Sequence, residues 1–221
     1  MNIIPIICFG VLALAMAGVY TFFSQKTGWQ GLLVKGLTIL SCVALASISG
    51  NLKAINNAYP LFVTLGLCVL VLCEALKVVG IENEKASDTT FGALNGLAFI
   101  LISLGGLSLG EFNIFAVLGG VFLVVALGML VCAIKKYKTF QRALCEILSF
   151  MGMGFIVGFG LMALLSTSHL ISSILMIAGG TILIASRLMQ TLSKGGKVII
   201  MITNAMYATA LAIIAFSIFL Y

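Results

Sequence analysis

The sequence predicts an all-α polytopic membrane protein with eight transmembrane helices. Of its 221 residues, 62% are hydrophobic and 8% are charged, and the mean hydropathy is +1.26. Soluble domains carry about 25% charged residues, so this chain has too little polar surface to cover a water-facing globule. Its apolar runs also have the length of a membrane crossing. The run Tyr59–Val79 would span roughly 30 Å as a helix, which is the thickness of the hydrocarbon core.

Four helices are predicted in the first half of the chain. Their ranges are Ile3–Phe23, Gly31–Ser49, Tyr59–Val79 and Phe91–Leu109. The first run has the small residues of a signal peptide, but no Lys or Arg precedes it and Lys26 follows it. That order of charges favours a retained helix with its N-terminus outside.

Four more helices are predicted in the second half. Their ranges are Phe112–Ile134, Leu144–Leu165, His169–Gln190 and Val198–Phe219. Gly154 and Gly158 form a GxxxG pattern in the sixth helix, which lets helix backbones approach closely in lipid. A flexible helix beside a transport pathway is the alternative reading. All loops are short, so residues 1–221 are expected to form a single membrane domain.

The distribution of Lys and Arg predicts the orientation of the helices. With the N-terminus outside, eleven of the twelve basic residues fall at the inner side. They are Lys26, Lys35, Lys77, Lys85, Lys135, Lys136, Lys138, Arg142, Arg187, Lys194 and Lys197. Only Lys53 lies at the outer side, so both termini are expected outside, with the plasma membrane as the expected location. Because the basic residues lie in short loops, the net charge of +6 does not indicate nucleic-acid binding.

Polar residues recur at matching places in the two halves. GLCVLVLCEALK at 66–77 aligns with GGTILIASRLMQ at 179–190. Three pairs keep an offset of 109 to 113 positions, namely Glu74 with Arg187, Lys35 with Glu146, and Asn95 with Asn204. This spacing predicts two diverged four-helix repeats, residues 1–110 and 111–221, related by an axis along the membrane normal.

The six paired residues define the candidate site, because they lie at similar depth near the inner ends of six predicted helices. A charge inside the membrane costs several kcal/mol, so each charge needs a partner or a task. We expect Glu74 to face Arg187 across the repeat axis, with Lys35 or Lys77 as its alternative partner. The set is either two ion pairs that join the halves or a polar pocket open to the cytoplasm. Ser103 and Tyr207 lie on the same helix faces as Asn95 and Asn204.

No metal or cofactor is expected. The chain has six cysteines, all within apolar segments and without CxxC spacing. Such cysteines are typical of small buried hydrophobic residues and not of metal ligands or disulfides.

The sequence around two of these positions resembles the lysoplasmalogenase (YhhN-like) family of eight-span membrane proteins. Lys35 in LLVKGLTIL resembles the Lys-Pro opening of that family's second span, with Gly36 in place of the proline. The segment GLCVLVLCEALKV resembles the apolar run that ends in Gly-Asp, with Cys73 and Glu74 in that place.

Two later segments extend the resemblance. FGALNGLAFILIS resembles the family helix that runs into a His, with Ser103 where the His would fall. AGGTILIASRLMQ resembles the late helix with a Ser-Asp pair, with Ser186 kept and Arg187 in place of the Asp. The span count and spacing cover the whole chain, whereas the motifs themselves are largely apolar.

The resemblance implies hydrolysis of the vinyl-ether bond of lysoplasmalogens, which gives a fatty aldehyde and a glycerophospho head group. This reaction needs a general acid and a base, for which Glu74 and Glu146 are the candidates. The candidate substrate-binding residues are Lys35, Asn95, Ser103, Arg187, Asn204 and Tyr207. Arg187 is expected to hold a phosphate head group. A membrane lipid or lysolipid is therefore the expected partner, and a non-catalytic lipid-binding or structural protein and a small-molecule transporter are the alternatives.

Overall fold

The computed structural model confirms the all-α fold class. It describes residues 4–23, 29–51, 58–79, 84–109, 113–135, 140–166, 169–192 and 196–221. The helices are α1 (Ile4–Phe23), α2 (Trp29–Asn51), α3 (Ala58–Val79), α4 (Glu84–Gly106), the short 3₁₀ helix η1 (Leu107–Leu109), α5 (Ile114–Lys135), α6 (Phe140–Ser166), α7 (Leu170–Leu192) and α8 (Lys197–Ser217). All eight α-helices are long and apolar enough to cross a membrane, and the described ranges contain no strand.

Two helices begin well before their predicted starts. α4 begins at Glu84 where the apolar pattern predicts Phe91, and α6 begins at Phe140 where it predicts Leu144. The added residues are mostly polar, so they do not show in a hydropathy pattern. The helix can still continue through them outside the hydrocarbon core, because its backbone hydrogen bonds do not depend on apolar side chains. Hydropathy therefore predicts where a helix crosses the membrane better than where it ends.

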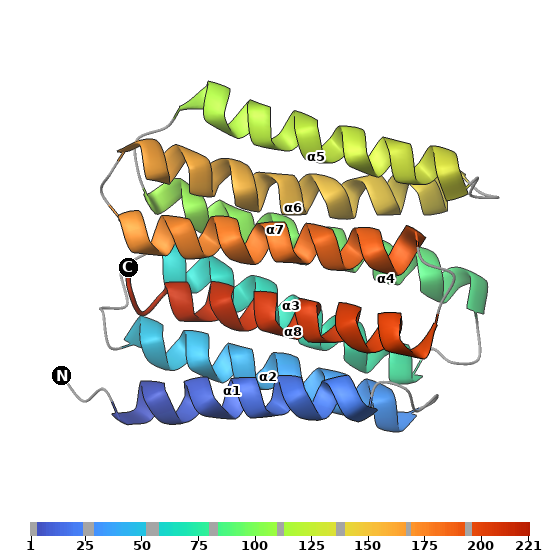
Figure 1. The fold of residues 1–221 in the computed structure, drawn as a ribbon, viewed down its shortest axis with the longest axis horizontal. Helices are drawn as coiled ribbons and strands as arrows, with labels where there is room; N and C mark the ends of the chain where they lie inside the picture. The colour runs from blue at the N-terminus through green and yellow to red at the C-terminus, as the bar shows by residue number, and fades with distance from the viewer. Residues whose placement is uncertain are drawn as a thin grey trace.

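The helices lie side by side in one bundle, with α1 at one edge and α5 at the opposite edge (Figure 1). α7 and α8 lie in front of α4 and α3 in this view. Because consecutive helices run in opposite directions, α1 begins and α8 ends at the same end of the bundle. The polar positions near the ends of α1, α3, α5 and α7 therefore lie at the same end as those near the starts of α2, α4, α6 and α8.

The contacts between helices follow the order expected of two four-helix units. Within each unit, successive helices are packed against each other, α1 to α4 and α5 to α8. Between the units, α2 packs against α8 and α6 packs against α4, which are equivalent contacts in a two-unit arrangement. The outer helices differ, since α1 also contacts α8 whereas α5 contacts α7. The division into halves, residues 1–110 and 111–221, stays a prediction, because the outer helices do not share this pattern.

The GxxxG pattern in α6 is a packing surface for α5. A Cβ atom added to Gly120 of α5 would lie 2.7 Å from the Cα of Gly158, and one added to Gly158 would lie 2.8 Å from the carbonyl oxygen of Val117. Both neighbours are backbone atoms, which cannot move aside as a flexible side chain does. The two helices approach closely because these positions lack side chains, as predicted for GxxxG in lipid.

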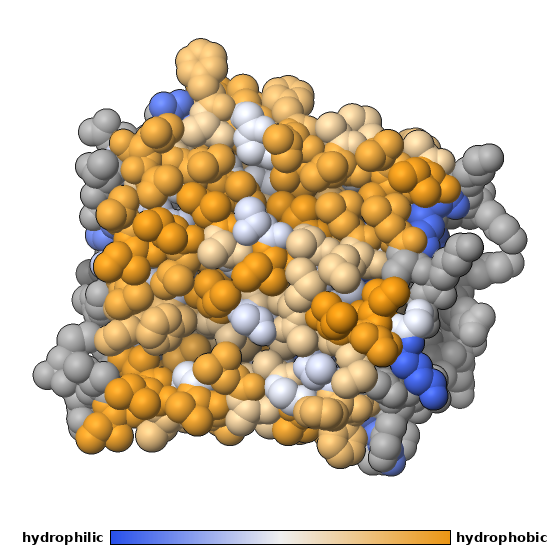
Figure 2. Space-filling view, viewed as in Figure 1, coloured by the Kyte–Doolittle hydropathy of each residue, from blue (hydrophilic) through white to orange (hydrophobic). Residues whose placement is uncertain are grey.

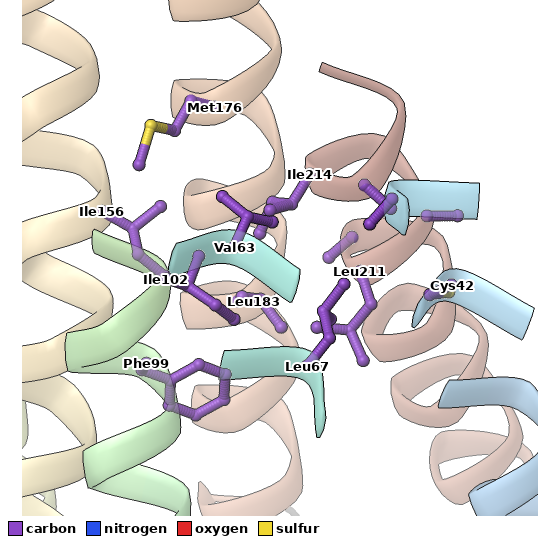
Figure 3. Close-up of a cluster of buried hydrophobic side chains, with 14 of the residues drawn as sticks. Cys42, Val63, Leu67, Phe99, Ile102, Ile156, Met176, Leu183, Leu211 and Ile214 are labelled. Atoms are coloured by element: carbon purple, nitrogen blue, oxygen red, sulfur yellow. The ribbon is translucent and has the colours of Figure 1, made fainter. Parts of the chain in front are cut away.

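Buried aliphatic and aromatic side chains fill the middle of the bundle. Figure 3 shows this cluster, to which α3, α4, α6, α7 and α8 all contribute. Leu67, Ile102, Ile156 and Leu211 are all at most 1% exposed. The core continues towards one end of the bundle through Phe99, which also lines the polar pocket described below.

The other end of the core is closed by an aromatic cluster. Tyr59, at the start of α3, is fully buried, and its phenolic oxygen lies 2.5 Å from the hydroxyl oxygen of Ser217 in α8. The ring of Tyr221 lies between the rings of Tyr59 and His169, with centroid distances of 5.1 and 4.4 Å. His169 is thus an aromatic packing residue at the end of the bundle opposite the polar pocket.

The surface of the bundle between its two ends is apolar. Figure 2 shows hydrophobic side chains over most of the visible face and hydrophilic ones near the ends. On α5, the side chains of Phe115 and Phe122 are 84% and 69% exposed. A soluble protein rarely exposes so large a continuous apolar surface, so this surface fits a lipid environment.

Candidate functional site

A polar cavity of about 130 Å³ lies at one end of the bundle, between α1, α2, α4, α6, α7 and α8. It is lined by Tyr20, Lys35, Asn95, Phe99, Ser149, Met153, Leu183, Ser186, Arg187, Gln190, Asn204 and Tyr207. Phe99, Met153 and Leu183 belong to the apolar core and form the inner wall. Gln190 is exposed, so the cavity reaches the surface near the end of α7.

One ion pair joins α2 and α3 at this cavity. The Lys35 Nζ lies 2.6 Å from the Glu74 Oε1, and the two side chains are 22% and 2% exposed. The same Nζ lies 5.1 Å from the centre of the Tyr207 ring, within the range of a cation–π contact. Lys35 therefore lies between a buried carboxylate and an aromatic wall of the cavity.

A second ion pair joins α6 and α7. Arg187 donates from Nε to Glu146 Oε1 at 2.9 Å and from Nη2 to Glu146 Oε2 at 2.5 Å. Its Nη1 donates to the Gln190 Oε1 at 3.3 Å. This bidentate geometry fixes the plane of the guanidinium as well as its position. The Arg187 side chain is 33% exposed and that of Glu146 8%, so the base again lies nearer to the surface than the acid.

The expectation that Glu74 faces Arg187 is wrong. Each acid pairs with a base of its own half, and Lys35 is the partner of Glu74 that the sequence left as an alternative. The reason is packing, since α2 lies directly against α3 and α6 directly against α7. The nearest opposite charge at the same depth is therefore on the neighbouring helix. The side chain of Lys77, the other alternative, lies outside the described residues.

Neutral polar groups complete the cavity wall. Tyr20 of α1 donates its hydroxyl to the Asn204 Oδ1 of α8 at 3.0 Å. Ser186 donates its hydroxyl to the Thr203 carbonyl at 2.8 Å, which ties α7 to α8. Ser149 donates to the Cys145 carbonyl, one turn earlier in α6, at 3.0 Å.

Most of the predicted binding residues meet at the cavity. Lys35, Asn95, Arg187, Asn204 and Tyr207 all line it. The predicted catalytic carboxylates, Glu74 and Glu146, do not line it and lie behind Lys35 and Arg187.

Ser103 does not join the cavity. It is 1% exposed and donates its hydroxyl to the Ile100 carbonyl at 2.6 Å. Ser103 shares a helix face with Asn95, but eight residues correspond to about 12 Å along a helix. That distance places Ser103 in the apolar core, two turns beyond the polar level.

Four polar lining residues were not among the predicted site residues, and one of them, Ser186, appeared only in a motif of the family resemblance. Ser149 follows Glu146 by three residues and Gln190 follows Arg187 by three, so helical spacing could have identified both. Tyr20 lies near the end of an otherwise apolar helix, and no spacing links it to the other polar residues. Its role depends on the contact between α1 and α8.

Neither metal ligands nor known relatives identify this site. Among the described residues, no group of three or more His, Cys, Asp or Glu is placed to hold a metal ion, and the six cysteines, all of them described, form no disulfide. No family model, curated protein or solved structure matches the chain. Function is therefore argued from the chemistry of the cavity.

Proposed function

We propose that this chain is an integral membrane protein that binds the polar head group of a membrane lipid or lysolipid in the cavity. The observation that carries the proposal is a polar cavity at one end of an apolar bundle, with two basic side chains in its wall. The apolar exterior supports a bilayer environment for the ligand's acyl chain.

The size of the cavity favours a head group over a whole lipid. A water molecule occupies about 30 Å³ in the liquid, so about 130 Å³ holds roughly four waters. Pockets that enclose a drug-sized molecule measure about 300–1,000 Å³. The ligand's acyl chain must therefore stay outside, in contact with the lipid-facing surface.

The position of the carboxylates favours binding without cleavage. Hydrolysis of a vinyl ether needs an acid that carries a proton and reaches the reacting carbon. Glu74 and Glu146 are each held in a salt bridge to a basic side chain, Lys35 and Arg187 respectively. Both also lie behind the side chains that line the cavity.

Vinyl-ether hydrolysis is the second candidate function. It is supported by the resemblance to lysoplasmalogenases, in which Glu74 stands at the position of the family's carboxylate. Purified protein in detergent should then release fatty aldehyde from a lysoplasmalogen. Glu74→Gln should slow that release by roughly 10²–10⁴-fold if Glu74 is the general acid. Absence of aldehyde release from the wild type would leave lipid binding as the function.

Binding is tested by the stabilisation that a lysolipid gives to the purified protein. A lysophospholipid should raise the melting temperature in a concentration-dependent manner. Asn95→Leu removes a polar lining group and should weaken that effect by about tenfold. The matched control is Leu97→Met, on the same helix at a 46% exposed position, which should leave the effect unchanged. Equal stabilisation of both variants would contradict binding in this cavity.

In this proposal the cavity faces the cytoplasm, both termini lie outside and the membrane is the plasma membrane. The basic side chains that the structure describes support the orientation, since they gather near one end of the bundle. They are Lys35, Lys135, Arg142, Arg187 and Lys197. In a cysteine-free background, an impermeant thiol reagent added outside should label Ala58→Cys and not Gly196→Cys, both exposed positions. The reverse pattern would overturn the orientation.

A further inference from the structure

We propose that the cavity is an oxyanion site in which Lys35 and Arg187, one base from each half of the chain, hold a phosphate-type group. This inference rests on the proposed function and names the chemistry of the head group. Glu74 and Glu146 are positioning residues in this site, because each acts through the base that it holds.

Both bases lie closer to the cavity than the acids with which they pair. Lys35 and Arg187 line the cavity from α2 and α7 and are 22% and 33% exposed. The carboxylates behind them are 2% and 8% exposed. Since the interaction between charges falls with distance, an anion in the cavity interacts more strongly with the bases than with the acids.

The geometry of Arg187 leaves one edge of the guanidinium directed away from its acid. Nε and Nη2 form one edge of the planar group, and both donate to Glu146. Nη1 lies on the other edge and reaches Gln190, which also lines the cavity. A planar group held on one edge by a carboxylate is pre-organised to present its other edge to an oxyanion.

The neighbouring amides add donors to the wall. The Asn204 Oδ1 accepts the Tyr20 hydroxyl, and the Gln190 Oε1 accepts the Arg187 Nη1. Because both amide oxygens already accept a hydrogen bond, the NH₂ groups of Asn204 and Gln190 are the groups that can donate to a ligand. An ionised phosphate oxygen only accepts hydrogen bonds, so this wall is complementary to it.

The charges of the two ion pairs cancel, which explains how two bases persist inside an apolar bundle. An unpaired charge in this environment would cost several kcal/mol. Among the described side chains no carboxylate lines the cavity, since Glu74 and Glu146 both lie behind a base, so this described wall offers a cationic head group no direct partner. The site therefore selects a phosphate group and disfavours an ammonium group.

The experiment is a charge series of ligands with one acyl chain, in a non-ionic detergent. The probes are a lysophosphatidic acid, a lysophosphatidylcholine and a monoacylglycerol, with inorganic phosphate as the probe without a chain. Affinity is measured from the concentration dependence of the melting temperature. We expect the lysophosphatidic acid to bind at least about tenfold more tightly than the monoacylglycerol, because hydrogen bonds to charged groups are the stronger ones. Inorganic phosphate should compete with it.

Paired substitutions test the two bases without stranding a charge. Glu146→Gln with Arg187→Met, and Lys35→Met with Glu74→Gln, each remove one base together with its acid. Each double variant should weaken binding of the lysophosphatidic acid by about tenfold and change that of the monoacylglycerol by less than about twofold. The control is Lys135→Gln, an exposed base at the same end of the bundle, which should change neither affinity.

The outcomes separate this inference from the proposed function. Equal affinity for all three lipids overturns the oxyanion site and leaves head-group binding standing. Binding of phosphate but of no lysolipid overturns the proposed function and keeps the oxyanion chemistry. Binding of none of the probes overturns both. If a double variant does not fold, the charge series on the wild-type protein still decides the inference.

Discussion

The ion pair in residues 1–110 joins α2 to α3, and the one in residues 111–221 joins α6 to α7, which are the matching helices of the predicted repeat, with the charges exchanged. In the first half the base is on α2 and the acid on α3, whereas in the second half the acid is on α6 and the base on α7. The first pair is a single contact of a lysine, and the second is bidentate. In both pairs the base lines the cavity and the acid lies behind it.

This difference shows what the two halves have in common. The residue types at equivalent positions differ, but a neutral pair of charges is present in both, at the same end of the bundle. A pair in lipid needs overall neutrality and a neighbouring helix, and either helix can carry either charge. In both pairs the base is the partner that lines the cavity, whichever of the two helices carries it.

The largest expected effect comes from removing the base of the first ion pair. Lys35→Met leaves Glu74, with a side chain 2% exposed, without this base, which should lower stability by about 3–5 kcal/mol. Arg187→Met leaves Glu146 at 8% exposure, so the loss should be smaller, about 1–3 kcal/mol. Thermal unfolding in detergent measures both. The companion substitutions Glu74→Gln and Glu146→Gln should recover much of each loss. Equal losses of stability in Lys35→Met and Arg187→Met would contradict the expectation that the more deeply buried acid makes the larger difference.

Arg187→Lys should have an intermediate effect. It keeps the charge but removes the bidentate contact with Glu146 and the contact with Gln190. We expect a loss of about 1–2 kcal/mol in thermal unfolding, because hydrogen bonds to a charged group are lost while the charge remains. A loss close to that of Arg187→Met would show that the fork geometry supplies nearly all of the pair's stability.

Tyr20→Phe should have a smaller effect, because it removes a neutral hydrogen bond in the same cavity. The Tyr20 hydroxyl donates to the Asn204 Oδ1 at 3.0 Å, and a typical neutral bond contributes about 0.5–1.5 kcal/mol. Thermal unfolding of the variant gives the reference against which the ionic contacts are compared. A loss as large as that of Lys35→Met would mean that the contact of α1 with α8 dominates the stability of the site.

The smallest expected effect is coupling across the two pairs. Glu74 and Arg187 belong to different ion pairs, so the losses of Glu74→Gln and Arg187→Met should add within about 0.5 kcal/mol. The cycle of Lys35→Met with Glu74→Gln should show clear non-additivity under the same conditions. Strong coupling between Glu74 and Arg187 would instead support a direct contact between these two residues across the predicted repeat axis.

Some of the site follows from the sequence through helical spacing and depth. Lys35, Asn95, Arg187, Asn204 and Tyr207 were predicted, and the structure brings them to one cavity. Depth was predictable because each helix starts and ends near a membrane interface, so a residue's distance from the helix end indicates its level.

The sequence by itself determined the number of crossings and the level of the polar groups. The run predicted at Tyr59–Val79 is α3 at Ala58–Val79, because the thickness of the bilayer sets the length of any helix that crosses it.

Only the tertiary structure decided which charges meet and which polar residues reach the cavity. It paired Glu74 with Lys35, placed both acids behind the bases and left Ser103 in the core. Helices that are apolar all round carry little information about which face points inward. Partner choice depends on the neighbours and rotation of each helix, which are set by packing contacts far apart in the chain.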